Sequence, residues 1–104
     1  MYRQGDVLIV PVDEVPPHLK PVPAENGLAI LAHGEAPGHR HAIADPRVSL
    51  FGGPPGLFMQ VLGDAPVALE HAEHATIAVP PGNYRIVRQR EYQPGLALSR
   101  MVCD

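Results

Sequence analysis

Short apolar runs separated by turn residues recur along the whole chain. The first, at residues 5–12, is almost continuously apolar, which is typical of a central strand buried on both faces. Other runs of strand length lie at 27–34, 39–44, 47–51, 57–63, 66–71, 75–79 and 82–92. Helical periodicity is nearly absent, and thirteen prolines leave few gaps for a helix of average length. The pattern predicts an all-β domain, either a compact barrel or roll or a small jelly roll, of about seven or eight short strands.

Turn residues predict where the chain leaves regular structure. Residues 13–26 hold four prolines and are expected to form an irregular loop. Residues 52–56, Gly-Gly-Pro-Pro-Gly, predict a second loop. The alanine-rich stretch 65–75 has room for one short helical turn near 70–74, and we expect no other helix.

Composition limits the class of protein. The 104 residues fit one domain, 1–104, that buries its core without cross-links, and a single cysteine excludes an internal disulfide. The net charge of −3 does not indicate a nucleic-acid-binding protein. The N-terminal residues lack the apolar stretch of a secretory signal, and no apolar run is long enough to cross a bilayer. We therefore expect a cytoplasmic protein that is not associated with a membrane.

Candidate chemistry is concentrated in two groups of histidines. His39 and His41 are two residues apart, so both would lie on one face of an extended strand. His71 and His74 are three apart, so they would share a side only if the strand breaks into a turn between them. Imidazole is the commonest protein metal ligand and also titrates near neutral pH.

These four histidines predict a divalent metal site if the two groups converge. Glu70 and Glu73 are candidate carboxylate ligands or hydrogen-bond partners for an imidazole N–H, and His33 is a further candidate ligand. Nitrogen ligands with an optional carboxylate suit zinc, nickel, iron(II) or manganese. An open coordination position would allow metal-assisted hydrolysis. The alternatives are a metal-free hydrolase with a histidine acid–base pair, and histidines that are only structural or surface groups.

The His-x-His step of residues 39–41 and the later histidine, in an all-β chain, resemble a cupin. The resemblance implies a small barrel that holds a metal on histidines and a glutamate, with isomerase or oxygenase chemistry. It places His39 and His41 at the histidine pair of the first cupin motif. Asp45 then stands near the position of the cupin glutamate.

The chain also resembles an uncharacterised group of small bacterial proteins. The shared features are the opening Gln4-Gly5-Asp6-Val7-Leu8, the step Gly38-His39-x-His41, and a closing stretch that runs from Pro80-Pro81-Gly82 to Tyr92. The resemblance implies no activity.

The last predicted strand carries tyrosine and arginine on the same face. Tyr84, Arg88, Arg90 and Tyr92 would share one face, where they could contact RNA or a protein partner. A non-enzymatic interaction module that uses this strand and the proline-rich loops is therefore the rival hypothesis. Other candidate partners are a small molecule and a second copy of the chain.

Overall fold

The structure is a computed structural model that describes residues 1–34 and 38–89, and in these residues every regular element is a β-strand. The strands are β1 (Tyr2–Gln4), β2 (Val7–Val12), β3 (Lys20–Val22), β4 (Ala29–His33), β5 (Arg40–Ile43), β6 (Val48–Gly53), β7 (Gly56–Val61), β8 (Val67–His71), β9 (His74–Val79) and β10 (Gly82–Arg88). No helix in the described residues is long and apolar enough to cross a membrane.

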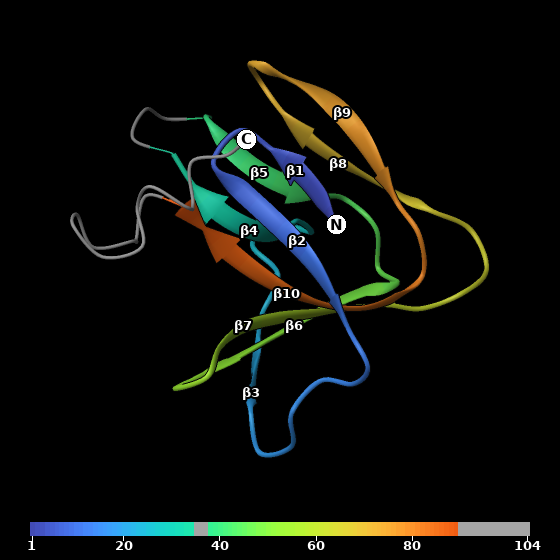
Figure 1. Cartoon of the computed structure of the whole chain (residues 1–104). Helices are drawn as coiled ribbons and strands as arrows, with labels where there is room; N and C mark the ends of the chain where they lie inside the picture. Colours follow the sequence, from blue (N-terminus) through green and yellow to red (C-terminus); the bar gives the residue numbers. More distant parts are fainter. Residues whose placement is uncertain (35–37, 90–104) are drawn as a thin grey trace.

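The strands form two antiparallel sheets that face one another (Figure 1). One sheet has the order β1-β2-β10-β7-β6-β3, and the other has the order β4-β5-β8-β9. The all-β prediction is confirmed. The expected strand count is too low, because the three-residue β3 lies in the expected loop at 13–26 and the three-residue β1 precedes the first expected strand. The two sheets do not close into a barrel.

One apolar core fills the space between the sheets. Ile9, Met59 and Ile43 are fully buried in it, together with Leu69 and Val79. They come from both sheets, as the alternation of apolar and polar positions along the strands requires. Burial of each such side chain contributes about 1.5–3 kcal/mol, so the core holds the sheets together without any cross-link.

Two expected irregular segments are regular in part. The glycine- and proline-rich stretch at 52–56 continues both β6 and β7, and Gly53 pairs with Gly56 across a two-residue Pro-Pro turn. The expected helical turn near 70–74 is a hairpin, in which only residues 72–73 form the turn between β8 and β9. Two-residue loops of this kind are the commonest connections between paired antiparallel strands.

Candidate functional site

The four histidines of the two sequence groups lie together where β5 begins and the β8–β9 hairpin turns. The ring centres of His41 and His71 are 4.3 Å apart, and those of His71 and His74 are 4.6 Å apart. His74 also stacks on His41 at 5.9 Å, and His39 meets the edge of His71 at 6.0 Å. We call His39, His41, His71 and His74 the histidine cluster.

A β-bulge places His74 on the same side of the sheet as His41. Leu69 pairs with Ile77, and His71 pairs with His74, so one residue of β8 faces two residues of β9 between these pairs. In a regular ladder the inward position next to Ile77 would fall on Ala75, and His74 would point to the other face. The extra residue in β9 reverses the side to which His74 points, so His71 and His74 both lie on the same side of the sheet as His41.

The Gln4 side chain ties this bulge to the buried histidine. Its amide nitrogen donates to the carbonyl oxygens of Leu69 and Ala75, each at 2.9 Å, and its amide oxygen lies 2.8 Å from Nδ1 of His41. The two carbonyls fix which end of the amide is the donor. The amide oxygen can therefore only accept, and the proton lies on Nδ1 of His41. In the neutral ring, Nε2 then carries the free lone pair.

Asp6 and Gly5 close the same side of the cluster. The Asp6 carboxylate oxygen Oδ1 lies 3.6 Å from Nε2 of His41, and its Oδ2 accepts a hydrogen bond from Arg88 at 3.4 Å. Gly5, with φ of 61°, lies so close to His74 that an added Cβ would be 2.7 Å from Nε2 of that ring. The β1–β2 turn thus contacts two rings of the cluster through a backbone that favours glycine.

The electrostatics keep His41 and His71 neutral and the Asp6 carboxylate ionised. Burial, with the nearby His71 charge, lowers the pKa of His41 to about 4. The pKa of His71 is also lowered, by burial and by His74 and His39. Burial raises the pKa of Asp6, but the charge and hydrogen bond of Arg88 outweigh it, so the net pKa lies below its ordinary value. At pH 7 an imidazole acceptor therefore faces a carboxylate acceptor.

Glu73 lies in the hairpin turn and contacts two of the rings. Its backbone N–H donates to Nδ1 of His71 at 3.0 Å, so the neutral His71 ring carries its proton on Nε2. Its carboxylate lies 3.6 Å from Nδ1 of His39, and both of these side chains reach solvent. Glu73 therefore lies beside two imidazole rings of the cluster.

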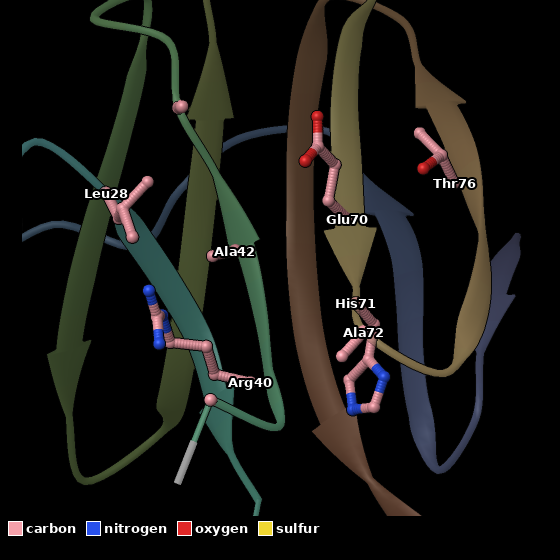
Figure 2. A pocket seen from close by; sticks show the side chains of 9 residues that line it. Leu28, Arg40, Ala42, Glu70, His71, Ala72 and Thr76 are labelled. Atoms are coloured by element: carbon pink, nitrogen blue, oxygen red, sulfur yellow. The ribbon is translucent and has the colours of Figure 1, made fainter.

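Two other candidate ligands point away from the cluster. A second bulge inserts Leu31 into β4, because Ile30 pairs with Ala42 but Ala32 pairs with His41. His33 is thereby turned to the outer face, where its exposed ring pairs with Glu25 at 3.3 Å. The structure therefore does not bring His33 together with the other histidines. Glu70 alternates with the inward Leu69 and also points to the outer face (Figure 2).

The expected partner-binding face of the last strand is largely inside the protein. Tyr84 is buried, and its hydroxyl donates to the carbonyl oxygen of Pro80 at 2.7 Å, so it is a core residue. Arg88 is half-buried and bonds to Asp6. The sandwich covers this face of β10 at Tyr84 and partly at Arg88, so partner binding through this strand stays a prediction. Arg90 and Tyr92 lie outside the described residues.

The cupin correspondence fails at its carboxylate. Asp45 accepts from Nε and a terminal nitrogen of Arg47, at 3.1 and 2.9 Å, and also from the Arg47 backbone N–H. It stabilises the turn between β5 and β6 instead of meeting His39 or His41. The acidic residue next to His41 is instead Asp6, which lies near the N-terminus in the turn between β1 and β2.

The donors of the cluster do not converge on one point as they stand. Among residues 1–34 and 38–89, no three His, Cys, Asp or Glu side chains are arranged to hold a metal ion together. What the structure supplies is one oriented pair, Nε2 of His41 and Oδ1 of Asp6, with His71 and His74 packed against it.

The family comparison agrees with the uncharacterised resemblance. A family model described as a domain of unknown function (DUF8820) matches residues 3–89, which is most of the chain. The chain belongs to this family. Its description assigns no activity and gives no support to the cupin resemblance. No significant match was found among curated proteins or among solved structures.

Sequence reasoning missed Gln4 and Asp6, although both stand in the opening Gln4-Gly5-Asp6 that the chain shares with the uncharacterised group. The opening has the appearance of an ordinary strand start. One signal was available: glutamine, glycine and aspartate together just before a buried apolar run give the turn a donor, a tight backbone and a charge.

Proposed function

We propose that this protein binds a divalent transition-metal ion between His41 and Asp6, with His74 and His71 supplying further nitrogen ligands. The observation that carries the proposal is the oriented pair. Nδ1 of the buried His41 is held by Gln4, so Nε2 presents its lone pair 3.6 Å from a carboxylate oxygen of Asp6.

A cation bound between these two acceptors would attract both of them, in addition to the Arg88 guanidinium that already bonds to the other carboxylate oxygen of Asp6. Two ligands of a tetrahedral ion lie about 3.4 Å apart when each bond is about 2.1 Å long, which is close to the observed separation. The usual way to orient a metal-binding imidazole is a hydrogen bond that its second ring N–H donates to a nearby oxygen acceptor. Gln4 fits that role for His41.

The third and fourth ligands require ring rotation, because the donors of His71 and His74 do not point at the pair. His74 needs only a change of its side-chain torsions, since it is exposed and lies over Gly5. His71 must rotate so that a bare nitrogen faces the ion, because its Nδ1 now accepts from the Glu73 N–H. That bond is exposed and therefore inexpensive to exchange.

Two or three imidazoles and one carboxylate form a set that suits zinc, nickel, iron(II) or manganese. Such an ion, with a coordination position left open, would polarise a carbonyl or phosphoryl oxygen or lower the pKa of a bound water to about 7. The proposal is therefore a metal-binding protein whose site has the ligands for Lewis-acid chemistry.

Elemental analysis after reconstitution tests the proposal. The purified protein is stripped with a chelator, incubated with zinc, nickel, iron(II) or manganese in turn, and desalted. We expect about one ion per chain in the natural protein and in His33→Ala, whose exposed ring lies on the other face. We expect loss of the ion in Asp6→Asn and His41→Gln.

Folding of each variant is checked by circular dichroism, and the Asp6→Asn variant is the safer one because this side chain is partly exposed. Retention of a stoichiometric ion by folded Asp6→Asn and His74→Ala would refute the assigned ligands. Failure of the natural protein to retain any of the four ions would refute the proposal itself.

A further inference from the structure

A pocket of about 330 Å³ opens on the outer side of the four-stranded sheet, next to the histidine cluster (Figure 2). It lies at the junction of β5 and β8, where the ladder has one pair of residues, Ala42 with Glu70. A junction with so short a ladder leaves space between the strands. His71 lines this pocket and also contacts His41, so the pocket adjoins the cluster directly.

The walls of the pocket carry opposite charges. Arg40 comes from β5 on one side, and Glu70 comes from β8 on the other (Figure 2). The pairing of Ala42 with Glu70 makes Arg40 a diagonal neighbour of Glu70, at a spacing of roughly 7–8 Å along the backbone. Within the part of the chain that the structure describes, the only salt bridges are formed by other residues, so neither charge is neutralised by the other.

The rest of the lining is small and mostly apolar. Leu28, Ala42 and Ala72 provide hydrocarbon surface, and Thr76 adds a hydroxyl beside Glu70. The volume is at the lower end of the range for small-molecule sites. A guanidinium group binds a carboxylate through two parallel hydrogen bonds, and a carboxylate on the opposite wall disfavours a ligand with several negative charges.

We infer that this pocket binds a small zwitterion, with its carboxylate on Arg40 and its ammonium group on Glu70, separated by a short hydrocarbon segment that lies on the alanines. The ligand then reaches His71, which the proposed function places beside the ion. Only this link to the ion rests on the proposed function, since the charge pair and the cavity do not require a metal.

Three matched probes test the inference by NMR titration of the chelator-treated protein. They are 4-aminobutanoate, butanoate and butylammonium, which carry both charges, the negative charge alone and the positive charge alone. We expect 4-aminobutanoate to bind at least tenfold more tightly than either of the others and to shift the amide signals of β5 and β8.

Two variants and one control assign the charges. Arg40→Gln is expected to weaken 4-aminobutanoate binding at least tenfold, and Glu70→Gln is expected to remove the preference over butanoate. Arg85→Gln, an exposed arginine on the other sheet, is expected to change neither. Equal binding of the three probes, no binding of 4-aminobutanoate, or an unchanged affinity in Arg40→Gln would overturn the inference.

Ion retention is measured on the same variants to separate this inference from the proposed function. Neither Arg40 nor Glu70 is a proposed ligand, so Arg40→Gln is expected to keep the ion of the natural protein. If the protein binds the zwitterion but retains no ion, this inference stands and the proposed metal site is refuted. If it retains an ion but does not bind the zwitterion, the metal site stands and this inference is refuted.

Discussion

Two β-bulges in the same sheet act on histidines in opposite ways. The extra residue in β4 turns His33 out to solvent, whereas the extra residue in β9 turns His74 in beside His41. The comparison teaches that a single inserted residue decides whether a histidine belongs to a site, because it reverses every side chain beyond it.

The two bulges also differ in what stabilises them. The bulge in β4 places Leu31 in the apolar core, where burial stabilises it. The bulge in β9 consists of exposed residues, and the Gln4 amide binds the carbonyl oxygen of one of them, Ala75. The first bulge therefore depends on hydrophobic packing, and the second depends on one polar side chain from another strand.

Gln4→Leu should have the largest effect on stability, because it removes the polar side chain that stabilises the β9 bulge. The β4 bulge does not depend on this side chain. The change leaves two carbonyl oxygens and Nδ1 of His41 without their Gln4 partner, at about 1–3 kcal/mol for each buried group. We expect a loss of about 3–5 kcal/mol in the free energy of unfolding, measured by urea denaturation. Gln60→Leu is the matched control, since that amide makes one bond of 3.3 Å, to Asn83, and it should cost about 1 kcal/mol. Equal losses in the two variants would contradict the role of Gln4.

Acidification should have the second-largest effect, by lowering the free energy of unfolding through protonation of the histidine cluster. The pKa of His41 is about 4 in the folded protein and about 6.5 in the unfolded chain, so the unfolded state binds more protons between these values. The contribution of the neutral His41 ring to the free energy of unfolding is therefore fully present above about pH 6.5. It is lost as the pH falls towards 4, at a cost of about 2–3 kcal/mol. The lowered pKa of His71 acts in the same direction.

Urea unfolding in the presence of a chelator, at intervals between pH 7.5 and 4, measures this dependence. His41→Gln should flatten the curve, while His33→Ala should leave its shape unchanged. A curve that stays flat in the natural protein would show that the cluster ring is not held neutral by its surroundings.

Gly5→Ala should have the smallest effect on stability and a selective effect on His74. A non-glycine residue with positive φ costs about 1–2 kcal/mol, and the new methyl group would displace the His74 ring. We expect this loss together with weaker ion retention. Gly27→Ala, which also has positive φ but has no atom near the added Cβ, should cost similar stability and leave the ion unaffected. Equal ion retention in both variants would exclude His74 from the site.

The sequence predicted much of the fold because its apolar runs are short and bounded by turn residues. Eight of the strands follow these runs within a few residues, and the missed ones, β1 and β3, have only three residues each. A strand of that length has too few positions to show an alternating pattern. The Pro-Pro turn after Gly53 was missed because its flanking glycines continue the ladder despite their low strand propensity.

The candidate site was predictable in its histidines and not in its other parts. The spacing of His39 and His41 implies a shared face, but the position of His74 depends on a bulge that no spacing reveals. Gln4 and Asp6 act through contacts with residues far along the chain, and a single sequence contains no record of such contacts. The outward direction of His33 was missed for the same reason, since Leu31 gives no local sign that it is the inserted residue.

The hydrogen bonds of the Gln4 amide also determine at which stage of folding the histidine cluster is assembled. Its partners Leu69 and Ala75 lie 65 and 71 residues further along the chain, so these bonds close some of the longest loops in the fold. Contacts that span such separations form late, because the entropy of the intervening chain opposes them. A ribosome must therefore deliver β9 before Gln4 can make both of these bonds, so the histidine cluster is assembled only after that strand has been synthesised.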